Sequence, residues 1–151
     1  MARYLNRRNE ALFPNLQRED YHVIGRATAR FNCIAHAAGD SERPWWPVEE
    51  GDDRAFWPNE IAREESVEAF LAAFATLGYV TCTGPELEPG FDKLAIYADP
   101  NGRPKHAAKQ TLSGFWSSKL GSLQTIEHRT LEALEGDSYG RAVAFLKRRS
   151  E

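Results

Sequence analysis

Cysteine is scarce in this sequence, with only Cys33 and Cys82 among 151 residues. Two cysteines are too few for a disulfide framework, so we expect two free thiols in a reducing compartment. Neither belongs to a Cys-x-x-Cys pair, and this spacing excludes a structural zinc finger. The thiols therefore serve either packing or chemistry.

Long apolar runs are also missing. No stretch approaches the roughly 18 apolar residues that cross a bilayer, and the first residues lack the apolar core of a secretory signal. Positive charge is not in excess either, because the formal net charge is −3. A mildly acidic chain has no general attraction to nucleic acid or anionic lipid. We expect a cytoplasmic protein that binds neither nucleic acid nor membrane.

The remaining composition is typical of one globular domain. Hydrophobic residues make up 42% and charged residues 27% of the chain, which provides enough apolar material for a core. Residues 1–20 are polar with scattered apolar anchors, and we interpret them as an arm that lies on the domain. Residues 21–151 are predicted to form a single α+β domain.

Helices are predicted in the first half of that domain. Residues 33–38 are small and apolar, Gly39 is a typical helix stop, and either Asn32 or Thr28 would cap the start. Residues 41–60 hold three tryptophans and three prolines, which favours an ordered loop. Residues 65–77 have an apolar face at helical spacing, formed by Val67, Phe70, Leu71, Phe74 and Leu77.

The second half is predicted to be an antiparallel sheet. An isolated strand is expected at residues 79–83, and a meander is expected to pack against the helix at residues 33–38. One or two helices are expected to close the chain around Gly136. The meander strands are placed at residues 94–99, 105–111 and 115–120, and the closing helices at residues 129–135 and 138–148.

Cys33 and His106 are the strongest candidates for chemistry. A thiol becomes nucleophilic when its pKa falls, and a helix N-terminus beside a basic group lowers it. If Asn32 caps the helix, Cys33 lies in the first turn, whose free N–H groups would also hold an oxyanion. His106 sits on a predicted strand beside two alanines, which leave room for a packed helix end. An inert core cysteine and a surface histidine are the alternative interpretations.

A third polar group would orient the imidazole of His106. The hairpin places Lys119 or Leu120 opposite His106 and Ser118 diagonal to it. Further candidates after this strand are Gln124, Glu127 and His128. Trp45 and Trp46 would wall a substrate groove, since aromatic rings offer a rigid contact area, or they would simply complete a small core.

A metal site is the rival arrangement. Cys33 and His36 lie three residues apart on one helix face, Asp40 follows, and His106 would complete a four-ligand set. The chain has no second closely spaced pair, so we expect no metal and no cofactor. His22 is interpreted as a histidine of a loop or strand edge.

Several strings resemble an uncharacterised family of small bacterial proteins, a domain of unknown function. They are Phe-Asn-Cys-Ile-Ala-His-Ala-Ala-Gly-Asp with the following Trp-Trp-Pro, then Lys-His-Ala-Ala-Lys-Gln, Phe-Trp-Ser-Ser-Lys-Leu-Gly and Ile-Glu-His. The order of Cys33, His106, and Ser118 or Glu127 also resembles papain-like and NlpC-type cysteine peptidases. This resemblance implies a papain-like layout, with N-terminal helices packed on a C-terminal sheet.

Three functions follow as expectations. The first is a cysteine hydrolase or acyltransferase that acts on an amide or thioester bond of a peptide or protein, with Cys33 as nucleophile and His106 as base. The second is a non-catalytic protein-interaction module of papain-like shape that uses the tryptophan-rich loop. The third is a metal-binding domain. The substrate and the oligomeric state are left open.

Overall fold

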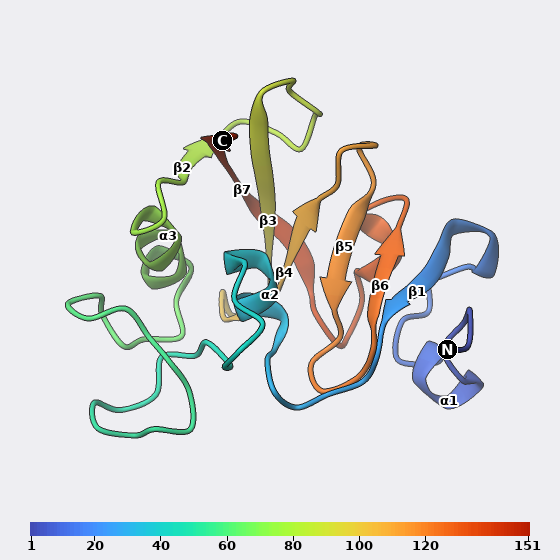
Figure 1. The fold of residues 1–151 in the computed structure, drawn as a ribbon, viewed down its shortest axis with the longest axis horizontal. Helices are drawn as coiled ribbons and strands as arrows, with labels where there is room; N and C mark the ends of the chain where they lie inside the picture. Colours follow the sequence, from blue (N-terminus) through green and yellow to red (C-terminus); the bar gives the residue numbers. More distant parts are fainter.

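One antiparallel sheet of seven strands forms the body of the protein (Figure 1). The structure is a computed structural model that describes residues 1–151. The strands are arranged in the order β1-β6-β5-β4-β3-β7-β2. Their bounds are β1 (Tyr21–Gly25), β2 (Val80–Cys82), β3 (Phe91–Ala98), β4 (Pro104–Gln110), β5 (Trp116–Lys119), β6 (Thr125–His128) and β7 (Arg141–Arg149). Together with its helices, the sheet makes this an α+β protein, as predicted.

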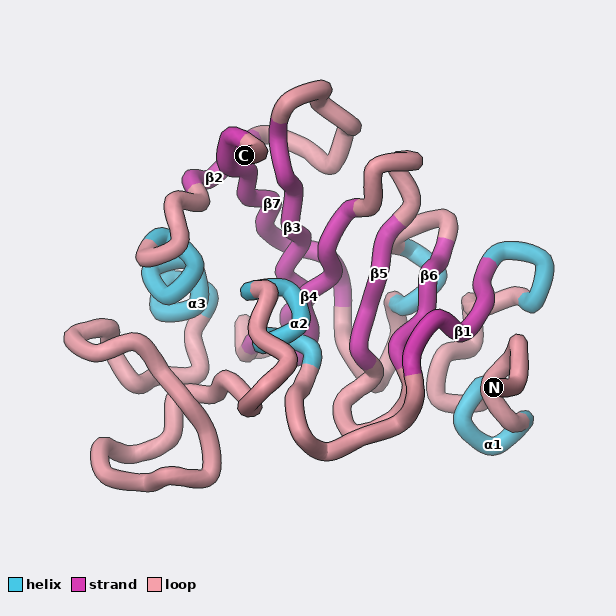
Figure 2. Tube along the Cα trace, viewed as in Figure 1, coloured by secondary structure: helices cyan, strands magenta, loops and turns pink.

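The helices are short and few (Figure 2). α2 (Cys33–Ala38) lies across the front of the sheet and packs against β4 and β5, which confirms its predicted bounds and packing. α3 (Val67–Ala75) lies next to β2, and α1 (Arg7–Glu10) lies near β1. Two 3-10 turns add Arg18–Asp20 and Glu132–Leu134. No helix is long and apolar enough to cross a membrane.

Two apolar clusters lie on the two faces of the sheet. The front cluster joins α2, α3 and the tryptophan loop to Leu94, Ile96 and Ala107. The back cluster joins the N-terminal arm and the 3-10 turn to Ala95 and Tyr97, among others. Successive residues of a strand point to opposite faces, and this alternation decides which cluster each residue enters.

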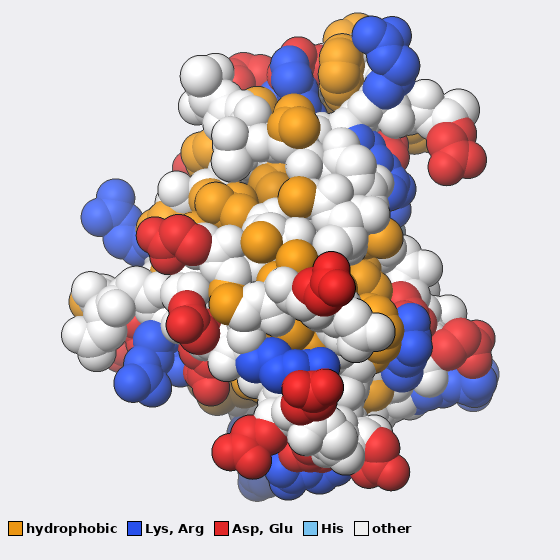
Figure 3. Space-filling view, turned by 90° about the vertical axis from the view of Figure 1, so that its left-hand side faces the viewer, with side chains coloured by type: hydrophobic (Ala, Val, Ile, Leu, Met, Phe, Trp, Pro, Cys, Tyr) orange, Lys and Arg blue, Asp and Glu red, His pale blue; other side chains and the backbone are white.

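The loop and helix predictions are partly confirmed. On α3, Phe70 and Phe74 are fully buried, but Leu71 is only half-buried, as is Leu77, which follows the end of the helix. The tryptophan loop is packed rather than open, because Trp45 and Trp57 are buried. Figure 3 views this side of the molecule and shows exposed apolar side chains along its middle, with charged side chains around and below them.

The predicted closing helices are wrong. Residues 138–148 enter strand β7, which pairs with β3 along its whole length, and residues 129–135 contain only the short 3-10 turn. The sequence of β7 is rich in alanine, leucine, lysine and arginine, which favour helix locally. Pairing with the buried strand β3 overrides that preference.

Candidate functional site

Cys33 occupies the first turn of α2, as predicted. The Asn32 side chain caps the helix, because its Oδ1 accepts a hydrogen bond from the Ala35 N–H at 3.1 Å. The thiol is buried in the front cluster, facing the backbone of Ala107. Burial raises the pKa of the Cys33 thiol to about 11, although the Ala107 N–H and Lys119 act in the opposite direction. At neutral pH this thiol is protonated.

His106 lies on the back of the sheet. Its ring stacks on Tyr139 at 4.2 Å between centroids and meets Tyr97 edge-on at 5.3 Å. Both tyrosines belong to or pack against the back cluster. The ring is fully buried, and neither nitrogen has a hydrogen-bond partner. Burial lowers the pKa of His106 well below its usual value, so the imidazole is neutral.

The structure does not bring Cys33 and His106 together. The thiol faces Ala107, and His106 is its neighbour on β4, so the two side chains lie on opposite faces of the sheet. A strand that points one residue at the helix points the next residue away from it. The predicted thiol–imidazole pair is therefore not formed in this register.

Two adjacent serines of β5 bind two other histidines on opposite faces of the sheet. In front, His36 Nε2 lies 2.9 Å from Ser117 Oγ, and that hydroxyl donates to the Lys109 carbonyl at 3.3 Å. The neutral His36 ring is therefore the donor to Ser117. Burial lowers the pKa of His36 to about 4.

At the back, Ser118 Oγ lies 2.8 Å from His128 Nε2, and His128 Nδ1 lies 2.8 Å from the Thr130 carbonyl. Because a carbonyl only accepts, Nδ1 carries the proton and Ser118 donates to Nε2. This arrangement has the polarity of a serine–histidine pair, but both side chains are fully buried. Ser118 therefore fastens β5 to β6 and makes no hydrogen bond to His106.

Lys119 is a charged group that lowers the pKa of the Cys33 thiol. Its Nζ donates to the Thr28 carbonyl at 2.7 Å and to the Gly121 carbonyl at 2.5 Å, and it lies 5.0 Å from the centre of the Phe31 ring. The side chain is fully buried, and burial lowers its pKa. Its contacts with Thr28 and Phe31 hold the segment that leads into α2 against β5, which is a structural role.

The other predicted site residues are also held by the fold. Asn32 binds Trp45 twice, since its Nδ2 donates to the Trp45 carbonyl at 2.8 Å and its Oδ1 accepts from the Trp45 N–H at 3.1 Å. Trp46 packs edge-on against Phe70. Glu127 is half-buried on β6, opposite Ser117 and therefore on the face away from His106. None of these side chains forms a substrate groove with Cys33.

The residues of the rival metal arrangement are separated as well. Asp40 accepts from Trp45 Nε1 at 2.8 Å and from Arg43, His36 binds Ser117, and His106 lies behind the sheet. No group of three or more histidine, cysteine, aspartate or glutamate side chains is placed to hold an ion.

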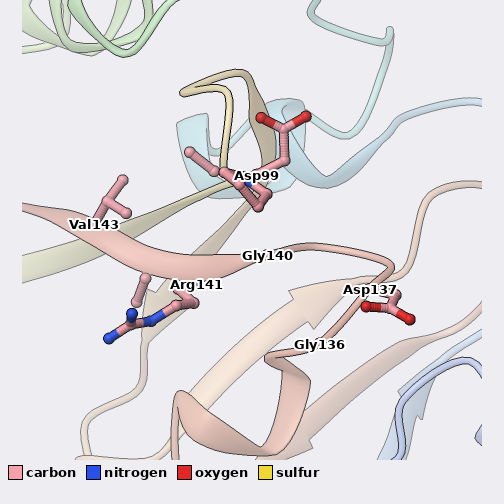
Figure 4. Close-up of a pocket in the computed structure, with 9 residues that line it drawn as sticks. Asp99, Gly136, Asp137, Gly140, Arg141 and Val143 are labelled. Atoms are coloured by element: carbon pink, nitrogen blue, oxygen red, sulfur yellow. The ribbon is translucent and has the colours of Figure 1, made fainter.

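A surface cavity of about 720 Å³ was not anticipated from the sequence. It lies where β3 ends and β7 begins, and its lining includes Asp99, Asp137, Arg141 and Val143 (Figure 4). The one sequence signal is the pair Gly136 and Gly140, whose mutual backbone hydrogen bonds close the loop before β7. A Cβ on Gly140 would lie 1.9 Å from the Ala98 carbonyl oxygen, so only glycine fits there.

The chain belongs to the family described as Domain of unknown function (DUF7689), whose match covers residues 22–147. This agrees with the uncharacterised family that the motifs indicated. No curated protein and no solved structure matches the chain.

Proposed function

We propose that this chain is a non-catalytic protein-interaction module. The observation that carries the proposal is the position of Cys33 and His106 on opposite faces of the sheet, each buried and each neutral at pH 7. A nucleophilic thiol needs an adjacent base and an accessible face, and neither is present at Cys33.

The element order supports a papain-like layout for this module. A helix with a cysteine in its first turn precedes an antiparallel meander and packs on two of its strands, β4 and β5. In place of the histidine that would face the thiol, β4 presents Ala107. The polar motifs then serve the scaffold: Asn32 holds the tryptophan loop, while Ser117 and Ser118 fasten α2 and β6 to β5.

Differential alkylation of the two cysteines tests this proposal. The native chain is treated with a limiting neutral alkylating agent near pH 7, and both sites are quantified by mass spectrometry. We expect Cys82, which is half-buried, to label before Cys33, which is 6% exposed with a raised pKa. Labelling of Cys33 should become fast only in denaturant.

A His106→Phe variant provides the second test, since it keeps an aromatic ring against Tyr139 but removes the base. Under the module proposal this change leaves the protection of Cys33 unaltered. Rapid native labelling of Cys33 that slows in His106→Phe would restore the hydrolase interpretation. A Cys33→Ala chain that still folds and binds its partner gives independent support.

A further inference from the structure

The outer edge of β7 is only partly covered. β3 pairs with this strand from Arg141 to Arg149, whereas β2 pairs with it only at Phe145, Leu146 and Lys147. The chain leaves the edge after Cys82, where Gly84 turns to accept from Lys93 Nζ at 3.0 Å. Residues 141–144 therefore have a strand partner on one side only.

The uncovered edge borders the 720 Å³ cavity. Arg141, Ala142 and Val143 line it from β7, and Gly136 and Asp137 line it from the preceding loop. In Figure 4, Val143 and Asp99 project to one side of β7 and Arg141 projects to the other. An unpaired strand edge beside a cavity of this size has room for another extended chain.

A bulge makes the edge accessible. Ile96 pairs with Ala144 and Tyr97 with Ala142, so Val143 is the extra residue and is 52% exposed. The Ala142 N–H donates to the Glu135 carboxylate at 3.1 Å, which is the only side-chain bond that the backbone of residues 141–144 makes. A carboxylate oxygen thus occupies the kind of position that a carbonyl of an added strand would take.

Two of the charges at the cavity are not neutralised within the chain. Arg141 makes no ion pair, and Asp137 makes none either. Asp99 differs, because it pairs with Lys105 at 3.9 Å and its Oδ1 accepts from the backbone N–H groups of Asn101 and Arg103. A guest segment with one acidic and one basic side chain would complement Arg141 and Asp137.

We propose that residues 141–144 of β7 bind an extended segment of a partner protein by strand addition, with an acidic side chain of the segment at Arg141 and a basic one at Asp137. This inference rests on the proposed function and specifies its surface. Main-chain hydrogen bonds along this edge, where a carbonyl of the segment would replace the Glu135 carboxylate at the Ala142 N–H, supply affinity, and the two charges supply orientation. A second copy of β7 fits poorly, because its own β2 would meet the loop from Gly136 to Gly140.

Peptide titration of the isotopically labelled full chain tests the proposal. The probes are short blocked peptides that alternate valine with threonine and carry one glutamate and one lysine. We expect amide shifts at residues 141–144. A matched peptide with N-methylated backbone amides should not bind, because it keeps the side chains but loses the donors.

A charge-reversal variant provides a second test. Arg141→Glu should weaken the acidic-and-basic peptide by about tenfold or more and should favour a peptide whose glutamate is replaced by lysine. The matched control is Arg149→Glu, which reverses an exposed arginine at the other end of the same strand and should leave binding unchanged.

Several results would overturn the inference. They are binding that survives N-methylation, shifts centred on the exposed Leu112 hairpin, peptide-free dimerisation that protects the same amides, and no binding at millimolar peptide. These failures concern the edge alone. The module proposal fails separately, through rapid native alkylation of Cys33, which needs no peptide.

Discussion

Burial keeps three of the four histidines, His36, His106 and His128, in the neutral state at pH 7. The pKa of His128 is lowered from 6.5 to about 4, chiefly by burial, while its bond to the Thr130 carbonyl acts in the opposite direction. Burial also lowers the pKa values of His36 and His106. Below about pH 6.5 these histidines bind protons in the unfolded chain but stay neutral in the folded chain. The stability contributed above that pH is therefore lost as the pH falls toward about 4.

His128→Asn should flatten this acid dependence. Between pH 7 and pH 5, a pKa difference of this size removes about 2 kcal/mol of folding free energy per histidine. The variant is expected to be less stable at pH 7, because Ser118 loses its acceptor, but to lose about 2 kcal/mol less on going to pH 5. Urea unfolding at both pH values measures this difference. An unchanged difference would mean that folding does not lower the pKa of His128.

At the scale of elements, α2 is where sequence and structure agree best. Its start follows from Asn32, whose side chain accepts from the Ala35 N–H, and its end follows from Gly39, which has a φ of +83°. Both signals are local, so the sequence alone is enough to place them. The strands of the meander are also predictable, because each is bounded by turn residues.

The face of β4 was not predictable in the same way. The alternation of side chains along a strand predicts that His106 and Ala107 point to opposite faces of the sheet. It does not predict which of the two faces packs against α2. The two residues that follow His106 are both alanines, so side-chain size favours neither register. A shift of the register by one residue would turn His106 to the other face of the sheet. The bulge at Val143 likewise interrupts the alternation in β7 and conceals a strand among helix-forming residues.

Asn32 couples α2 to the tryptophan loop, so its loss should affect more than a helix cap. Asn32→Ala removes the cap and both bonds to Trp45, and we expect a loss of about 2–4 kcal/mol in unfolding free energy. Asn32→Asp keeps the acceptor for the Ala35 and Trp45 N–H groups and should lose about half as much. Chemical denaturation of both variants provides the comparison. Equal losses would show that the donor to the Trp45 carbonyl carries most of the coupling.

At the scale of the whole molecule, the two edges of the sheet are treated differently. At one edge, the N-terminal arm approaches β1, where the Val23 N–H donates to the Arg3 carbonyl at 2.7 Å. At the other, β2 covers three residues of β7 and leaves residues 141–144 open. Exposed strand edges promote unwanted association, so proteins usually cover them. We place the proposed interaction surface at residues 141–144 because this part of the edge has no strand partner and lies beside the cavity.

The arm is an integral part of the domain, although the family match begins at residue 22. Leu5 is 1% exposed and belongs to the back cluster with Tyr21, whose hydroxyl accepts from the Leu5 N–H at 3.0 Å. Glu10 adds a salt bridge to Arg18 at 2.8 Å and a hydrogen bond from Tyr21. The arm therefore packs on the back of the sheet and covers part of it.

Leu5→Ala and Leu12→Ala test this with the same chemical change at two sites of the arm. The buried Leu5 should cost about 2–5 kcal/mol of unfolding free energy, through lost burial and a residual cavity. Leu12 is 47% exposed, and its truncation should change stability by less than about 0.5 kcal/mol. Urea unfolding of both variants in the full chain measures the contrast. Equal, small losses would mean that the arm lies on the domain without stabilising it, and the folded unit would then be confined to the region that the family match covers.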